Sequence, residues 1–208
     1  MDIFRPGGLE LTEKAAVSMA LGRGARLLDV GCGLGTSLDF LARRFGVEPH
    51  GVDASVEAVL RAGRPYILHG RAEALPFPDG SFDAVLMECV LPLFDRPEKA
   101  LDEAGRVLKK GGGLAVGALS GRGLGALTEA GRADFGAVGA YLEARGFTLT
   151  LLSDESAALR QFIGEVIFRY GSIEQYVSAA EASLGGGVLD CRTPRRGTGY
   201  ALLTARKD

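Results

Sequence analysis

Three acidic side chains stand where apolar segments of the chain end, and each could bind a ligand. Asp29 interrupts the apolar segment 27–30, Asp53 closes a short segment, and Glu88 closes the segment 82–88. Apolar segments of this kind predict buried parallel strands, and ligands bind outside the carboxyl ends of such strands. A carboxylate has two acceptor oxygens, so it can hold neighbouring hydroxyl groups of one ligand. The three acids therefore predict one ligand site at a single edge of a sheet.

Glycines occupy every second position directly after the first of these acids. Gly31, Gly33 and Gly35 lie between a predicted strand and a helical pattern over 38–45. Because glycine has no Cβ, a ligand can approach the backbone there, and the helix N-terminus offers unpaired N–H groups. The G-x-G-x-x-G spacing of dinucleotide-binding enzymes fails, because Thr36 holds the third position. A tight turn that binds nothing is the alternative for this segment taken alone.

Strand and helix patterns alternate along the chain, which predicts a doubly wound parallel α/β sheet with helices on both faces. Thr12 and Ser55 are predicted helix caps, and Asp95 with Pro97 opens a further helix. The segments 71–80, 120–131 and 185–197 are predicted loops. The predicted strands are 26–30, a short one ending at 53, 66–68, 82–88, 114–119, 147–152 and 199–205, and the predicted helices are 12–21, 36–45, 56–62, 95–110, 134–145 and a pair within 159–184.

Composition describes an ordinary globular protein. The 208 residues, 47% of them hydrophobic, with a net charge of -2, predict a single domain over 1–208 with an N-terminal helix segment at 1–22. No apolar run approaches the roughly 18 residues of a membrane span, and the Lys and Arg residues form no basic block, so neither membrane nor nucleic acid is an expected partner. The sparse cysteines Cys32, Cys89 and Cys191 and the lack of a leader pattern favour the cytoplasm. Monomer and homodimer both fit.

The glycine-rich turn, with Asp29 before it, resembles motif I of the class I S-adenosylmethionine (SAM) methyltransferases. Further segments match in order between about Arg26 and Leu119, namely 51–55, 71–77, 79–83 and 106–113. The resemblance implies a seven-stranded sheet in the order 3-2-1-4-5-7-6, with strand seven antiparallel. It also implies SAM as cofactor and S-adenosylhomocysteine (SAH) as product. The pattern is similar to small-molecule methyltransferases, including quinone-pathway C-methyltransferases, and its flanks resemble an uncharacterised bacterial subgroup.

The resemblance also implies roles for individual residues. Asp29 would hold the methionine ammonium group, Asp53 the ribose hydroxyls, and Glu73 the adenine edge, while Arg5 could pair with the methionine carboxylate. The alternatives are an Asp29 bonded to turn N–H groups, an Asp53 that caps a helix, a solvated Glu73, and an exposed Arg5 on a frayed terminus. The full set of predicted cofactor residues is Arg5, Asp29, Gly31, Cys32, Gly33, Gly35, Asp53, Ala54, Ala72, Glu73 and Glu88.

Glu88 and Cys89 are predicted to face the methyl group from the end of the fourth main strand. Glu88 could act as a general base, hold a polar group of the acceptor, or be bonded locally. Cys89 could accept a methyl group or simply pack in the core. No Asp-Asn pair follows this strand, so no metal site is predicted. His50 and His69 are expected to be structural residues on the core side.

The segment 154–197 is a predicted helical insertion between the last two strands. Apolar residues recur there at helical spacing from Leu159 through Phe162 and Val166 to Tyr170, too much apolar surface to leave in water. We expect this pair of helices to form a lid over the acceptor beside Glu88, with dimerisation as the alternative. For the whole chain, the rival functions are a SAM-binding regulatory domain and a nicotinamide-dependent oxidoreductase.

Overall fold

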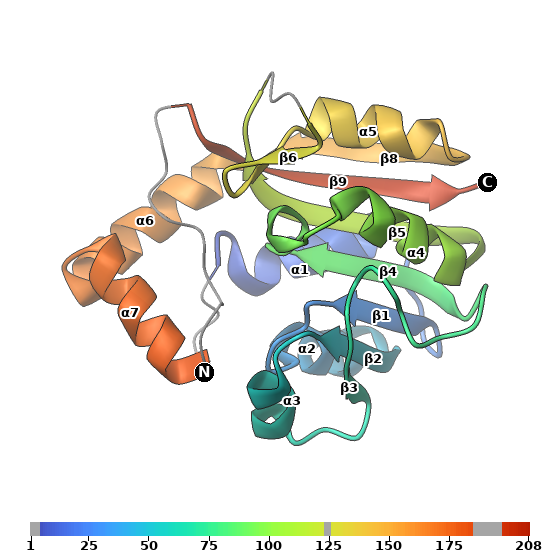
Figure 1. The fold of residues 1–208 in the computed structure, drawn as a ribbon, viewed down its shortest axis with the longest axis horizontal. Helices are drawn as coiled ribbons and strands as arrows, with labels where there is room; N and C mark the ends of the chain where they lie inside the picture. The colour runs from blue at the N-terminus through green and yellow to red at the C-terminus, as the bar shows by residue number, and fades with distance from the viewer. Residues whose placement is uncertain (1–4, 123–125, 185–196) are drawn as a thin grey trace.

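The computed structural model describes residues 5–122, 126–184 and 197–208, and it folds into one sheet with helices on both faces (Figure 1). The strands are β1 Arg26–Val30, β2 Glu48–Asp53, β3 Ile67–His69, β4 Phe82–Glu88, β5 Leu108–Ser120, β6 Thr128–Glu129, β7 Arg132–Ala133, β8 Phe147–Asp154 and β9 Gly199–Lys207. The helices are α1 Gly8–Ser18, α2 Thr36–Phe45, α3 Val56–Ala62, the short 3-10 helix η1 Leu91–Leu93, α4 Pro97–Val107, α5 Phe135–Glu143, α6 Ser156–Tyr170 and α7 Ile173–Leu184.

The long strands follow the order β3-β2-β1-β4-β5-β9-β8. Strand β9 runs antiparallel to both of its neighbours, whereas β1 to β5 are parallel to one another. The predicted order 3-2-1-4-5-7-6 is therefore confirmed, with β8 and β9 as its strands six and seven. The carboxyl ends of β1, β2 and β4 share one edge of the sheet, and the strand order reverses between β1 and β4, where ligands of such sheets bind.

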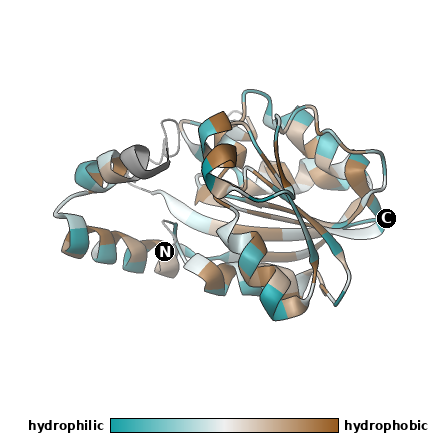
Figure 2. Cartoon of the chain, turned by 90° about the horizontal axis from the view of Figure 1, so that it is seen from below, coloured by the Kyte–Doolittle hydropathy of each residue, from teal (hydrophilic) through white to brown (hydrophobic). Residues whose placement is uncertain are grey.

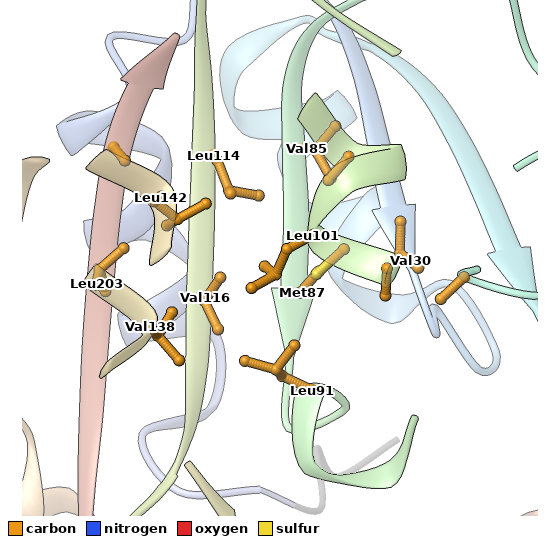
Figure 3. Close-up of a cluster of buried hydrophobic side chains, with 14 of the residues drawn as sticks. Val30, Val85, Met87, Leu91, Leu101, Leu114, Val116, Val138, Leu142 and Leu203 are labelled. Atoms are coloured by element: carbon orange, nitrogen blue, oxygen red, sulfur yellow. The ribbon is translucent and has the colours of Figure 1, made fainter. Parts of the chain in front are cut away.

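Two apolar layers hold the helices against the sheet. On one face, Leu101 of α4 and Val138 of α5 pack on Val116 and Leu203 of the central strands (Figure 3). On the other face, α1, α2 and α3 cover a second cluster that includes Leu38 and strand residues. Burying a large aliphatic side chain contributes roughly 1.5–3 kcal/mol. These two layers give the sheet edge a rigid base for the site.

The first helix begins earlier than the predicted cap at Thr12. Gly7, with a φ of 71°, precedes the helix, and α1 starts at Gly8 without a side-chain cap. A left-handed φ of this kind is open to glycine at little cost, so the glycine pair starts the helix. Thr12 therefore lies inside α1, where its side chain is free for another role. The predicted cap Ser55 is confirmed, because its hydroxyl accepts a hydrogen bond from the N–H of Ala58 at 3.1 Å.

The segment predicted as the loop 120–131 contains part of a short hairpin. Strands β6 and β7 pair with each other, and Ala133 of β7 pairs with Ser120 at the end of β5. Leu127 and Ala133 join the same core cluster as Leu91 of η1. The hairpin is thus held beside η1, the segment that follows Cys89.

Helices α6 and α7 pack against each other and extend beyond the sheet (Figures 1 and 2). Val166 of α6 packs with Tyr176 of α7 inside the pair. At the start of α7, the N–H of Gln175 donates to Ser172 Oγ at 3.2 Å. Phe168 stays 90% exposed. None of the helices in the described ranges is long and apolar enough to cross a membrane.

Candidate cofactor and acceptor site

The three glycines of the turn after β1 have different roles. Gly31 and Gly35 both have a φ of 76°, and a Cβ would lie 2.5 Å from Val90 in the first case and 2.6 Å from Ile67 in the second. Gly33, with a φ of 52°, has no atom within 4 Å of the place where its Cβ would stand. Two glycines therefore permit tight packing, and Gly33 presents bare backbone to open space, where a ligand can approach closely.

Asp53 ties the end of β2 to this turn. Its Oδ2 accepts a hydrogen bond from the N–H of Gly33 at 2.7 Å, and its Oδ1 accepts one from the N–H of Ser55 at 2.8 Å. Each carboxylate oxygen has two lone pairs, so both can still accept a bond from a ligand hydroxyl. Ala54 follows it and is exposed.

Cys32 packs inside the turn. Its Sγ lies 2.6 Å from where a Cβ on Gly51 would stand, and burial raises the pKa of its thiol well above the ordinary range. A neutral thiol in this place fills space and leaves ligand binding to the surrounding backbone.

Asp29 is a buried carboxyl group to which no described residue donates a hydrogen bond. The N–H groups of Gly31 and Cys32 donate to the carbonyl oxygen of Val52 instead, at 2.7 and 3.2 Å, so the alternative of a carboxylate bonded to turn N–H groups is wrong. Burial, and next the nearby charge of Glu88, raise the pKa of Asp29 well above its usual range. A buried anion without a partner is costly, so a cationic group of a ligand is the fitting complement.

Glu88 lies at the centre of a buried polar cluster. Arg5 Nη1 donates to Glu88 Oε1 at 2.8 Å, and the two side chains are only 11% and 7% exposed. The hydroxyls of Thr12 and Ser37 donate to the same carboxylate at 3.0 and 3.1 Å. Arg5 is therefore not the exposed arginine of a frayed terminus. A buried ion pair is tolerated when further hydrogen bonds satisfy its remaining lone pairs. The two hydroxyls supply such bonds to Glu88.

Cys89 adopts a strained backbone conformation beside this cluster. Its φ is 61°, unusual for a residue with a side chain. Its Sγ lies 3.1 Å from the hydroxyl oxygen of Tyr200, and its N–H donates to the carbonyl of Gly117 at 2.6 Å. Burial raises the pKa of both the Cys89 thiol and the Tyr200 phenol. A neutral thiol is a poor nucleophile, so the geometry favours a packing role for Cys89.

Tyr200 is a site residue that the sequence analysis missed. It is 2% exposed and packs with Leu11, Leu119 and Leu159. The available signal was a single tyrosine at the start of an otherwise aliphatic strand. Its position near Cys89 depends on β9 lying next to β5, which is a property of the fold rather than of any local pattern.

The predicted adenine segment follows β3. Ala72 is buried, and Glu73 is buried too, so the alternative of a solvated acid at position 73 is wrong. Glu73 Oε1 accepts a hydrogen bond from the N–H of Arg96 at 3.4 Å, at the beginning of α4. His50 is half-buried against aromatic rings, as expected, whereas His69 is exposed and not on the core side.

Metal ligands do not gather in the parts of the chain that the structure describes, which hold no group of three or more His, Cys, Asp or Glu residues suited to an ion. Cys191 lies outside the described residues. The site is thus composed of carboxylates, one buried arginine, hydroxyls and open glycine backbone. This donor set fits a ligand that carries hydroxyl groups and an amino group.

Comparison with known proteins shows the family to which the chain belongs. A methyltransferase domain family matches residues 28–134. The chain is 30% identical to the 27-O-demethylrifamycin SV methyltransferase of Amycolatopsis mediterranei over 95% of its own length and 82% of that protein. It is 39% identical to a ubiquinone/menaquinone biosynthesis C-methyltransferase of Methylobacterium nodulans over 54% of its length and 50% of the relative. The chain spans about half the length of several curated relatives that it matches.

Solved structures show the same fold. The [4+2]-cyclase SpnF superposes with a TM-score of 0.73 at 30% identity, over 96% of this chain and 81% of that one. Phosphoethanolamine N-methyltransferase 2 of Haemonchus contortus, in complex with SAM, superposes with a TM-score of 0.74 at 20% identity, over 99% and 54% of the two chains. The chain belongs to the class I SAM-dependent methyltransferases, and SAM is its cofactor.

Proposed function

We propose that the protein transfers the methyl group of SAM to a small-molecule acceptor that binds beside Glu88 and Cys89. The observation that carries this proposal is the buried, unpartnered Asp29 next to Asp53 and the open backbone of Gly33, at the edge where the strand order reverses. A relative that matches 95% of the chain is named a 27-O-demethylrifamycin SV methyltransferase.

In this proposal the chain binds SAM through groups of known chemistry. Asp53 accepts the ribose hydroxyls, Asp29 holds the amino group, and Ala72 and Glu73 line the adenine edge. Gly31, Gly33, Gly35, Cys32 and Ala54 shape the turn that the cofactor approaches. Bound SAM supplies an already activated methyl group, so the task of the protein is to place donor and acceptor in line.

Arg5 and Glu88 then act together. Both oxygens of Glu88 are occupied by Arg5, Thr12 and Ser37, which supports a positioning role over that of a general base. Arg5 has N–H donors beyond those that Glu88 binds, so it can also reach the carboxylate of the cofactor. The ion pair thereby connects the N-terminal segment to the cofactor.

Helices α6 and α7, within the segment 154–197, are proposed to wall the acceptor; residues 185–196 of that segment lie outside the described residues. Leu159 and Ile163, in the first half of α6, pack in the cluster that contains Cys89 and Tyr200. This contact supports a lid that begins directly beside the reacting groups. The alternative, a dimer contact, would use the outer end of the helix pair, where Phe168 is exposed.

The proposal is tested with purified protein and SAM carrying a deuterated methyl group. The acceptor panel contains phenols, quinols, amines and carboxylic acids, and mass spectrometry detects SAH and any labelled product. Calorimetry with SAM, SAH and NAD measures cofactor choice. Labelled product together with SAM binding supports the proposal. Binding of NAD in place of SAM would overturn it.

A second function is favoured by one specific comparison, because SpnF shares 30% identity over nearly the whole chain and its structure is described as a [4+2]-cyclase. A cyclisation or a regulatory role would leave SAM unconsumed. Tight binding of SAM with no SAH formed from any acceptor would favour these functions over methyl transfer.

A further inference from the structure

The hairpin β6–β7 continues the row of side chains that begins at Glu88. Ser120 of β5 pairs with Gly199 of β9 and also with Ala133 of β7. A strand has only two edges, so β7 must lie on the edge of β5 that faces β4. Glu88, the last residue of β4, pairs with Gly117. The hairpin strand therefore takes up the same edge just beyond the end of β4.

The side chain of Arg132 points to the face of the sheet on which Cys89 and Tyr200 lie. Its neighbour Ala133 belongs to the core cluster under α4 and α5, and successive side chains of a strand point to opposite faces. The pairing of Ala133 places Arg132 level with Leu119, a member of the cluster around Tyr200 and Cys89. At about 3.3 Å per residue, Arg132 lies only about 7 Å along the row from Glu88.

One nitrogen of the half-buried Arg132 side chain lacks a hydrogen-bond partner in the part of the chain that the structure describes. Its Nε is buried and has no hydrogen-bond partner among the described residues. Glu129 stands opposite in the hairpin register, yet no ion pair joins the two. The only other buried side-chain atom without a partner in the described ranges is Thr198 Oγ1, which lies just before β9 and two residues from Tyr200.

These two groups contrast with the neighbouring cluster. Arg5 is neutralised by Glu88 and surrounded by hydroxyls, whereas no carboxylate of the described residues forms an ion pair with Arg132, and its buried Nε has no partner among them. Buried polar groups are nearly always paired in native structures, because leaving one unpaired costs free energy. An unpaired arginine on the acceptor side is therefore expected to serve a ligand.

We infer that Arg132 recognises an anionic group, a carboxylate or a phosphate, on the methyl acceptor. This inference rests on the proposed function and specifies its substrate class. The planar guanidinium can donate two parallel hydrogen bonds to either group, and Thr198 can add a third. A negative acceptor also complements the positive sulfonium of the cofactor, so donor and acceptor attract each other within one site.

The test uses the whole chain saturated with SAH and titrated with benzoate and, separately, with inorganic phosphate in a calorimeter. At least one of the two anions should bind, and Arg132→Gln should weaken that binding roughly 10- to 150-fold, the range for hydrogen bonds to a charged group. Arg132→Lys should retain part of the affinity. Arg43→Gln, at an exposed arginine of α2, is the matched control and should change nothing. The SAH affinity of each variant shows that the fold is intact.

Binding of benzoate alone assigns a carboxylate acceptor, and binding of phosphate alone assigns a phosphorylated one. If neither anion binds the wild-type protein, or if Arg132→Gln binds as tightly as wild type, the inference is overturned. A neutral acceptor that Arg132→Gln methylates with unchanged kcat/KM would also overturn it and leave the proposed function standing. Conversely, anion binding that depends on Arg132, without any methylated product, would support the inference about Arg132 and count against the proposed methyl transfer.

Discussion

Replacing Asp29 by asparagine should stabilise the SAH-free protein at neutral pH and, at the same time, weaken SAH binding. The two effects have one cause, because the Asp29 carboxyl group is buried beside Glu88 without a hydrogen bond from the described chain. Burial makes its ionised form costly in the folded protein, and asparagine removes that cost. The amino group of the cofactor would lose its counter-charge.

The size of the first effect follows from the raised pKa of Asp29. Each unit by which the folded-state pKa exceeds the unfolded value of about 3.9 corresponds to about 1.4 kcal/mol of stability at high pH. Because the folded pKa is raised, the wild-type protein keeps full stability below about pH 4 and loses it as the pH rises through the folded-state pKa. The advantage of Asp29→Asn should therefore be near zero at pH 4 and grow toward pH 8.

The second effect should be a loss of about 1.5–3 kcal/mol of SAH binding, roughly 10- to 150-fold in Kd, the range for a hydrogen bond to a charged group. Urea denaturation from pH 4 to 8 and calorimetry with SAH measure the two effects. Asp83→Asn is the control. Burial opposes ionisation of Asp83, but hydrogen bonds from Lys109 and the backbone of Arg26 outweigh it and lower the pKa of Asp83, so this variant should lose stability and bind SAH normally. A stability change of Asp29→Asn that is unfavourable or constant with pH would refute the reasoning.

Three further predictions concern the rest of the site. Asp53→Ala should weaken SAH binding by about 1.5–3 kcal/mol, since Gly33 and Ser55 also lose their acceptor; unchanged affinity by calorimetry would count against the ribose assignment. Arg5→Ala should lower the free energy of unfolding by about 3–5 kcal/mol, because it leaves Glu88 buried without its partner, and should raise the Kd for SAM; a urea curve like that of wild type would contradict the buried pair. Ile163→Ala should alter acceptor kinetics and leave SAM affinity nearly unchanged if α6 forms a lid, whereas a change in the mass measured in solution would indicate a dimer contact.

The pattern of elements could be predicted from the sequence because local signals define most of them. Strand β4 and helix α3 have the predicted bounds, and Ser55 and Asp134 cap their helices through side-chain hydrogen bonds. The structure differs from the predicted bounds where strand pairing between distant segments sets the ends of an element. Strand β5 begins at Leu108 because Leu108 still pairs with Phe82 of β4, before a register shift that leads to Gly113, and no local pattern reports such a partner.

The site residues also fall into two groups, those that the sequence could indicate and those that only the tertiary structure reveals. The acids at strand ends were recognisable because their spacing reflects one βα unit after another. The partners of Glu88 were not recognisable, because Thr12 reaches it only when α1 starts at Gly8, and Ser37 only when α2 lies beside α1. Arg132 and Tyr200 became visible as site residues only through the order of the strands around β5.

Strand β9 lies between β5 and β8, although it is the last strand in the sequence. The sheet can therefore be completed only after β9 has been synthesised. Residues 113–120 leave the ribosome with one edge exposed, and their partners are residues 199–206. Until those arrive, the edges of β5 and β8 are open to pairing with other chains, a known route to aggregation. Tyr200 enters only with this last insertion, so the acceptor side matures after the half that binds the cofactor. A nascent chain could therefore acquire SAM affinity before it acquires activity, and chaperone demand should be greatest in that interval.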